Sequence, residues 1–456
     1  MRCKSEKTAH GALLGCLLGC LLVGGCASYR PAPLDLAPAS LDAPIASVLS
    51  ADASAIRRPF LTPATIDLAR PLDLNAVATI AVLANPDLKA LRARAGIADA
   101  QVFSVGLLPD PTFSFTAEPL ISGADPVANL ASGLGFNINA LRTRGIVRRQ
   151  LTAQARQVRL DFAWSEWQTA GQARIQAVRV VRLERYVELA RQSSETAAGL
   201  LARVLRAIGR GDLLPTEAQA SRTAAFDAAV RLRLATRDLA AARFELRRLM
   251  GVPPEYAFDL APLPAPAVPF DSARLFEIAL AQRTDLEALR AGYAAQEAGV
   301  RRAVLDQFPT LELAINGTRD SARNVALGPT VAFTLPLWNR NRGPIAIESA
   351  TRAALRSEYD ARLFGTRAQI AAAAGGVAVA RGQRASILAN LPVARQFAQA
   401  TRRAATRGDL PLATAETAEQ AVRDQELLIA QNDQDIAEQT IALELLTGAP
   451  QESWTR

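Results

Sequence analysis

The sequence predicts a mainly helical protein with a small β part, in which one unit of helices and strands is written twice. Three observations support this fold class. The same landmarks recur at an offset of 197 or 198 residues, which is typical of an internal duplication. Each copy holds long, proline-poor stretches with helical spacing of apolar residues. Each copy also holds two short runs that alternate apolar and polar residues, as half-buried strands do.

The duplication is visible in landmarks that occur in the same order in both halves. An offset of 198 superposes two Asp-Leu-Xaa-Ala-Leu-Arg-Ala segments, residues 87–93 and 285–291. The later landmarks match as Pro111 with Pro309, Phe136 with Phe333, Arg210–Leu213 with Arg407–Leu410, and Gly251 with Gly448. Alanine- and arginine-rich helices can mimic part of this match, but not the Pro and Gly-Asp landmarks. We therefore expect two repeats, residues 71–253 and 270–450, a Pro-rich linker, residues 254–269, and a short tail, residues 451–456.

The N-terminus reads as a lipoprotein signal peptide, residues 1–25. A basic start precedes an uncharged apolar stretch, residues 11–23, which is too short to span a bilayer as a helix. Small residues stand before Cys26, so we expect Cys26 to become the lipidated N-terminus. The alternative sites Cys16 and Cys20 fit the same pattern, but only cleavage at Cys26 leaves the full apolar core upstream.

The residues after the predicted cleavage site point to an anchored, non-enzymatic chain. Ala27 follows the cysteine where an inner-membrane retention signal would place Asp, which favours the outer membrane. A Pro- and Ala-rich lead, residues 26–70, is expected to be extended. The only histidine, His10, and the other cysteines leave with the signal. His- or Cys-based catalysis, thiolate metal sites and disulfides are therefore excluded, and we expect no enzyme activity, no metal and no cofactor.

The charge pattern argues against nucleic acid as a partner. The formal net charge is +8, and the cations are almost all arginines interleaved with Asp and Glu. No basic run alternates with aromatic residues. Because no apolar run beyond the signal approaches the length of a spanning helix, any crossing of a membrane must use strands.

Each repeat is expected to contain a helix, two strands, a very long helix and a returning helix. The predicted ranges are 74–107 and 273–306 for the first helix, 112–118 with 131–140 and 310–317 with 328–338 for the strands, 145–208 and 343–406 for the long helix, and 213–250 and 411–447 for the returning helix. At 1.5 Å per residue the long helix spans roughly 95 Å and the two shorter ones roughly 51 and 57 Å. We therefore expect the two shorter helices to lie end to end beside the long one.

Turns of the sequence Gly-Asp-Leu are predicted to close the two helical hairpins. Gly211 and Gly408 suit the left-handed end of a helix, and Asp212 and Asp409 are candidate N-caps of the returning helices. The candidate tip residues are Arg210, Gly211, Asp212, Leu213, Arg407, Gly408, Asp409 and Leu410. Arginines that gather near these tips fit either a solvated helix surface or a surface that attracts acidic residues of a partner.

The alternating strands predict one apolar and one wet face. The candidate lipid-facing residues are Phe113, Phe115, Leu134, Phe136, Ile138, Leu311, Leu313, Ile315, Val331, Phe333 and Leu335. Four strands cannot close a barrel, and an open edge is not tolerated in lipid. Three copies would supply 12 strands, which is within the range of membrane barrels. The alternative is a soluble four-stranded sheet packed on its own helices.

These features together resemble the TolC family of outer-membrane efflux proteins. The segments that carry the resemblance are the helix starts Asn85–Leu88 and Thr284–Leu286, the segment Gly328–Gly343, and Cys26 followed by Tyr29-Arg30-Pro31. The resemblance implies a homotrimer with a 12-stranded barrel in the outer membrane and a long α-helical coiled-coil barrel in the periplasm. It also implies that the hairpin tips meet a periplasmic adaptor, which joins the channel to an inner-membrane pump, typically of the RND type in this family.

The function expected from the sequence is a passive outer-membrane duct for small toxic solutes, drugs or metal ions, in a tripartite efflux pump. Type I protein secretion is the alternative cargo class. A periplasmic, lipid-anchored coiled-coil adaptor or scaffold is the alternative function, because adaptors also carry a long helical hairpin. Adaptors flank a single hairpin with β-rich domains, however, whereas this chain is expected to contain two hairpins in tandem.

Overall fold

The computed structural model describes residues 29–36, 42, 44, 46–119, 121–122, 128–263 and 271–454. The chain divides into two units, Met1–Leu41 and Asp42–Arg456, and all helices and strands that the structure describes lie in the second. Cys26 lies outside the described residues, so its lipidation stays a prediction.

The first repeat follows a helical segment of the N-terminal lead. Its elements are α2 (Ala46–Ala55), α3 (Leu74–Ala84), α4 (Pro86–Gly106), β1 (Thr112–Glu118), β2 (Asn129–Asn137), α5 (Ile138–Gly209), the short 3-10 helix Pro215–Glu217, and α6 (Ala218–Met250). The second repeat has the same order: α7 (Ser272–Gln282), α8 (Thr284–Leu305), β3 (Leu311–Arg319), β4 (Val325–Phe333), α9 (Arg342–Thr406), α10 (Leu412–Thr447) and the 3-10 helix Gln451–Ser453. The mainly helical fold with a small β part is confirmed.

Each repeat breaks its first helix in two, where the sequence predicted one. Asn85 leaves the helical conformation with a ψ of 124°, and its side chain accepts a hydrogen bond from the Leu88 amide to cap α4, whose first residue is Pro86. A proline at this position starts a helix but disfavours helical geometry in the residue before it. Arg283 makes the corresponding break between α7 and α8, with a ψ of 114°.

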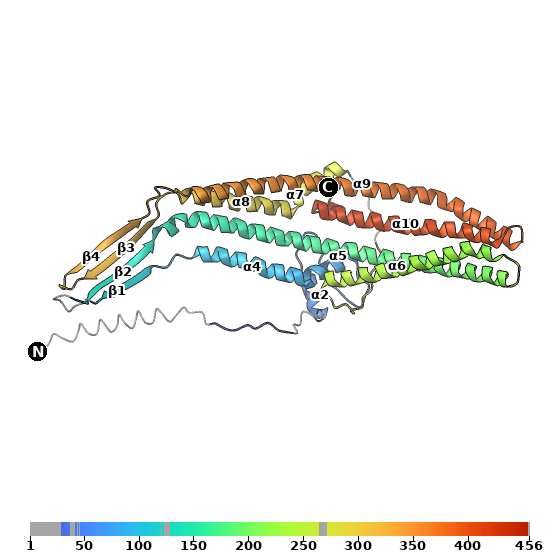
Figure 1. Ribbon diagram of the computed structural model, residues 1–456, viewed down its shortest axis with the longest axis horizontal. Helices are drawn as coiled ribbons and strands as arrows, with labels where there is room; N and C mark the ends of the chain where they lie inside the picture. The colour runs from blue at the N-terminus through green and yellow to red at the C-terminus, as the bar shows by residue number, and fades with distance from the viewer. Residues whose placement is uncertain are drawn as a thin grey trace. The chain divides into compact units, whose positions relative to one another are not determined.

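The shorter helices lie along the long helix of their own repeat, as their lengths predicted. In the first repeat α5 contacts α3, α4 and α6, and in the second α9 contacts α7, α8 and α10. Figure 1 shows α4 and α6 following one another along α5. α5 also contacts α8 and α10, so it joins the two repeats.

The four strands form one antiparallel sheet in the order β1-β2-β3-β4. The predicted strand 131–140 is wrong at its end, because α5 already begins at Ile138 and the Asn137 side chain accepts a hydrogen bond from the Ala140 amide. The predicted strand 328–338 is also displaced, since β4 ends at Phe333, three residues before Pro336. A proline cannot donate to the ladder, which accounts for an earlier end. The predicted strand 310–317 runs instead from Leu311 to Arg319.

The lead and the tail pack more closely than their composition predicted. Residues 46–55 form α2, so the expectation of a fully extended lead is wrong for this segment. The largest apolar core joins α2, the rest of the lead, α3, α5 and α6, and the linker residues Phe258 and Leu260 pack against it. At the other end of the chain, Trp454 packs into a smaller core formed by α7, α9 and α10.

Candidate functional site

One face of the sheet collects the apolar side chains that the alternation predicted. Phe113 pairs with Leu134, and Leu134 pairs in turn with Ile315. On the same face, Leu313 pairs with Phe136 on one side and with Val331 on the other, and Leu311 pairs with Phe333. All these large apolar side chains are exposed. An exposed apolar area of this kind marks a surface that meets a protein or a membrane.

The opposite face of the sheet carries small and polar side chains. A Cβ added to Gly133 would lie 2.4 Å from Asn316 Oδ1 and 2.8 Å from Ser114 Oγ, so polar side chains lie across the glycine. The Asn316 side-chain amide also donates to Thr330 Oγ1, 2.7 Å away. This face is therefore suited to water.

Two predicted lipid-facing residues are not in strands. Ile138 is the first residue of α5, and Leu335 follows the end of β4. The apolar face instead extends the other way, to Val325 and Leu327 of β4, which are both 79% exposed. The alternation of Val325, Ala326, Leu327 and Gly328 in the sequence could have revealed them.

The hairpin tips are built alike in the two repeats. Gly211 and Gly408 have φ angles of +80° and +84°, which only glycine adopts readily. Each tip holds a local ion pair, Arg210 with Asp212 at 2.8 Å and Arg407 with Asp409 at 2.9 Å. The predicted N-cap roles of the two aspartates are therefore wrong: a 3-10 turn separates Asp212 from α6, and α10 begins after Pro411.

A cleft of about 1120 Å³ lies beside the first tip, between the α5–α6 hairpin and the start of α10. Its lining includes the predicted tip residues Arg210, Asp212 and Leu213, but none of Arg407, Gly408, Asp409 and Leu410. Glu416 was not predicted from the sequence; its carboxylate is buried and paired with Arg203. The second carboxylate oxygen of Glu416 is also buried and has no hydrogen-bond partner among the described residues.

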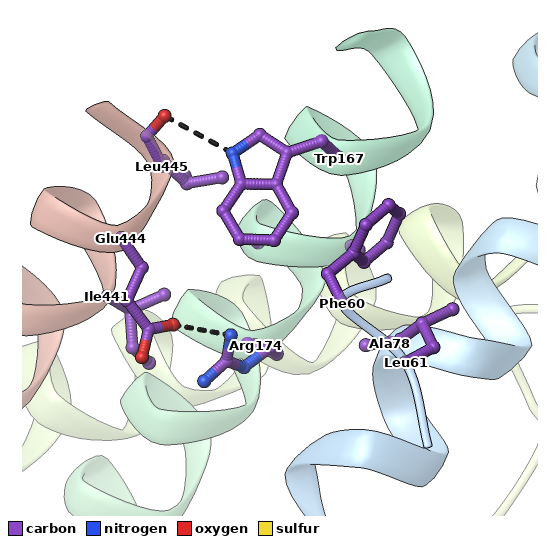
Figure 2. A pocket seen from close by; sticks show the side chains of 10 residues that line it. Phe60, Leu61, Ala78, Trp167, Arg174, Ile441, Glu444 and Leu445 are labelled. Atoms are coloured by element: carbon purple, nitrogen blue, oxygen red, sulfur yellow. Dashed lines mark hydrogen bonds and ion pairs between the residues drawn. The ribbon is translucent and has the colours of Figure 1, made fainter. Parts of the chain in front are cut away.

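α5 and α10 meet in a joint that fixes the two repeats to each other. Figure 2 shows the Trp167 indole nitrogen donating to the carbonyl oxygen of Leu445, 3.2 Å away, and Arg174 paired with Glu444 at 2.5 Å. A Cβ on Gly171 would lie 2.1 Å from a methyl carbon of Leu445, so a side chain at this position would force the helices apart. Phe60 of the lead covers Trp167 with a T-shaped ring contact at 4.9 Å.

α9 exposes the equivalent face to solvent in the part of the chain that the structure describes. Phe364 stands 197 residues after Trp167, and it is 78% exposed whereas Trp167 is 5% exposed. The exposed apolar residues Val379, Val393 and Phe397 recur at helical spacing on the same face as Phe364. Between Phe364 and Phe397, α9 carries no acidic residue and four arginines, Arg367, Arg381, Arg384 and Arg395.

Buried charges concentrate where α5, α8 and α9 meet. Arg283 makes two hydrogen bonds with Asp285, at 2.9 and 2.6 Å, and its guanidinium lies 4.7 Å from the ring centre of Trp164. Arg362 approaches the same carboxylate at 3.5 Å. Burial, and then repulsion by Asp285, raise the pKa of Asp161 above its ordinary value.

Two further observations bear on the class of protein. No group of three or more His, Cys, Asp or Glu side chains that could hold a metal ion occurs in the described part of the chain. Among the described helices, α9 alone is long and apolar enough to cross a membrane, and 22% of its apolar window is buried. The expectation that no apolar run reaches that length is thus wrong, although the window is rich in alanine, which also favours close packing between helices.

Comparison with known proteins agrees with the predicted resemblance. Residues 275–449 match the family model of the outer membrane efflux protein. The outer-membrane channel OprN is 17% identical with a TM-score of 0.68, covering 92% of this chain and 99% of that chain. The CmeC outer membrane channel of Campylobacter jejuni is 15% identical with a TM-score of 0.69, covering 82% and 85%. The outer membrane protein VceC of Vibrio cholerae is 14% identical with a TM-score of 0.68, covering 82% and 96%.

No curated protein matches the chain by sequence. Residues 275–449 of the second repeat are similar to the outer membrane efflux protein domain, and the described fold resembles that of the outer-membrane channels. The matched family and structures are channels and not enzymes.

Proposed function

We propose that the chain is the outer-membrane channel of a tripartite efflux pump, in which three copies form one passive duct for small toxic solutes. The observation that carries this proposal is that both outer edges of the sheet and one face of α9 have no partner among the described residues. Within the described residues β1 pairs only with β2, and β4 pairs only with β3. Both outer strands thus leave a row of backbone donors and acceptors unpaired.

The sheet supports a barrel made by several copies. Its apolar face is exposed and its opposite face is polar, which suits a wall between lipid and a water-filled lumen. Because an open edge in lipid leaves backbone groups unsatisfied, the edges must pair with other copies. Three copies supply 12 strands, since each contributes four.

The internal duplication indicates how the helices of neighbouring copies would pack. In one chain, the face of α5 that contains Trp167 and Gly171 is covered by α10 of the second repeat. The same face of α9, with Phe364 and Ala368, is exposed in the described part of the chain. The pseudo-equivalent of α10 is α6, which packs on its own repeat and meets the second repeat through the ion pair of Arg231 with Asp424 of α10, at 3.1 Å. We assign α6 of a second copy as the cover. Such a head-to-tail contact generates a closed ring when the rotation between copies closes, as a threefold rotation would.

The remaining parts have partners in this proposal. The hairpin tips and the cleft beside Glu416 would receive a periplasmic adaptor, which links the channel to an inner-membrane pump. Lipidation at Cys26 would anchor the chain to the outer membrane. The two tandem hairpins favour the channel over the alternative of a single-hairpin adaptor. Drugs and metal ions are the proposed cargo classes, and growth of a deletion strain across a panel of both, with type I secretion substrates as a third arm, would identify the cargo.

Cysteine cross-linking tests the assembly. The mature chain would have no cysteine except the acylated Cys26, so introduced pairs are clean reporters. Gly171 and Leu445 touch within the chain. Ala368 is the counterpart of Gly171 in the second repeat, and Arg248 is the counterpart of Leu445 in the first, each at an offset of 197 residues. The cross-linking variant is therefore Ala368→Cys with Arg248→Cys. The double variant should give covalent dimers and trimers in membranes. The control pair Ala368→Cys with Arg243→Cys should not, because Arg243 lies five residues before Arg248 and so on another side of α6, where it pairs with Glu184 of α5.

Conductance tests the duct. The purified protein should insert into planar bilayers as ohmic pores, and the trimer should migrate faster in gels before heating than after it, as closed membrane barrels do. A protein that extracts as a monomer after delipidation and conducts no ions would overturn the proposal in favour of the adaptor.

A further inference from the structure

The four connections between the strands and the helices meet at one end of the sheet. Residue 112 begins β1 and pairs with residue 135 near the end of β2, and residue 311 begins β3 and pairs with residue 333 at the end of β4. The connecting segments are residues 107–111, 137–149, 301–310 and 334–343, and we call them the collar.

The collar is strongly positive. Its four segments contain eight arginines, no lysine and two acidic residues, Asp110 and Asp306, which gives a formal charge of +6. The sequence between β1 and β2, residues 119–128, and that between β3 and β4, residues 320–324, contain one arginine and two aspartates. The positive charge therefore belongs to the helical end of the sheet alone.

The charge of the collar is largely uncompensated within the chain. Arg148, Arg301, Arg340 and Arg342 are exposed and form no ion pair with any described residue. Arg302 pairs with Asp306, at 3.6 Å. Water can solvate such arginines, so their exposure alone does not identify a ligand.

Large apolar side chains are exposed among these arginines. Trp338 is 88% exposed, and Leu337 and Phe308 are 60% and 53% exposed. Phe308 precedes β3 in the chain, and Leu337 and Trp338 follow β4. Arginine beside exposed tryptophan and leucine is the composition of a membrane–water interface, where the apolar side chains enter the acyl region and the guanidinium groups reach phosphate.

We propose that the collar binds the headgroups of anionic glycerophospholipids in the leaflet that faces the helical part of the protein. The inference rests on the proposed function, because it needs the sheet to lie in a bilayer. Each arginine near an anionic surface adds to the attraction, and guanidinium groups bind phosphate oxygens in pairs. The uneven charge of the two sheet ends would also keep the protein from inserting in the opposite direction.

The test compares lipid retention by the full-length protein and two variants of equal charge. R148Q/R301Q/R342Q removes three collar arginines, and R94Q/R185Q/R356Q removes three exposed arginines from the helices α4, α5 and α9 outside the collar. Detergent-solubilised protein is titrated with phosphatidylglycerol or with phosphatidylcholine, and bound lipid is counted by native mass spectrometry. The wild type and the control variant should prefer phosphatidylglycerol by about tenfold or more, and the collar variant should lose this preference.

The same proteins in planar bilayers separate the possible results. The collar variant should have the same reversal potential in a KCl gradient as the wild type. Lipid preference that is equal in the wild type and the collar variant overturns the proposal, as does a reversal potential that shifts while lipid retention stays the same, because the arginines would then line the pore. Failure of the wild type to conduct ions would instead overturn the proposed function, whatever the lipid result.

Discussion

The two repeats build the same junction between their shorter helices with different chemistry. In the first repeat the Asn85 side-chain amide donates to the Leu249 carbonyl oxygen, 2.9 Å away. In the second, the Arg283 guanidinium donates to the Leu446 carbonyl oxygen, 3.1 Å away, and also binds Asp285. Gly251 and Gly448 end the helices with φ angles of +63° and +71°. The two junctions thus share a left-handed glycine, but a neutral hydrogen bond holds the first and a buried ion pair holds the second.

The repeats also differ in how they are covered. The first repeat has the larger apolar core, to which the lead contributes, and its long helix is covered on one face by α10. The second repeat has a smaller core, and its long helix exposes the corresponding face. The first repeat thus buries more apolar side chains within the chain, whereas the second repeat leaves exposed a helix face that the proposed trimer would cover.

The largest contrast is expected between Trp167 and its pseudo-equivalent Phe364. Trp167→Ala removes a buried ring and its hydrogen bond, and should lower the free energy of unfolding by about 3–5 kcal/mol. Phe364→Ala should change that of the monomer by less than about 0.5 kcal/mol, because the ring is exposed, yet should weaken trimer formation. Helical circular dichroism during denaturation measures the first quantity and cross-linking yield the second. Equal losses of unfolding free energy would contradict the contrast.

The second largest contrast in unfolding free energy is expected at the junctions between the shorter helices, at Asp285 and Asn85. Asp285→Ala leaves the Arg283 guanidinium buried without its carboxylate, which we expect to cost about 3 kcal/mol of unfolding free energy. The matched change Asn85→Ala breaks a neutral hydrogen bond to the Leu249 carbonyl and removes the cap of α4, and it should cost about 1–2 kcal/mol. Hydrogen exchange of α7 and α3 would report each loss locally. The distinction between a charged and a neutral junction fails if Asn85→Ala is the more damaging variant.

The tips are the region where the repeats are alike, so charge reversal there should act equally. Arg210→Glu or Arg407→Glu alone should weaken adaptor binding by a similar factor, and the double variant by about tenfold at low salt. Each reversal also places a carboxylate beside Asp212 or Asp409. Adaptor binding measured at two salt concentrations checks this, with Arg94→Glu on α4 as a remote control. Binding unchanged by the double variant would show that the tips do not contact the adaptor.

The smallest effect is expected at Asp161, beside the charged junction. Burial and the neighbouring Asp285 raise its pKa, while Arg362 lowers it. The folded state therefore binds this proton more tightly than the unfolded state, and stability from this group is present at low pH and lost as pH rises through the raised pKa. Asp161→Asn should stabilise the protein at pH 7 by a few tenths of a kcal/mol, because the site is partly exposed. The free energies of unfolding at pH 4 and pH 7 should differ less for the variant than for the wild type.

The sequence predicted the duplication and the main elements because their signals are local and repeated. The left-handed glycines at 211 and 408 follow from the turn, and the apolar strand face follows from alternation. The strand ends were less well predicted. Asn137 reads equally well as the last strand residue and as the first cap of a helix, and only the hydrogen bond to the Ala140 amide decides between them.

Other features depend on contacts between residues far apart in the chain. Glu416 is an ordinary helix residue in the sequence, and its burial appears only when α10 lies against α5. Gly171 likewise carries no signal until Leu445 occupies the space of its missing side chain.

By itself, then, the sequence determined that one helical unit is written twice, with two alternating strands and a glycine turn in each copy. Periodicity and turn chemistry act over a few residues, so they can be read along the chain. Only the tertiary structure decided that the two copies are unequal. Which face of a long helix is covered depends on the packing of distant segments, and this packing covers Trp167 while it leaves Phe364 exposed.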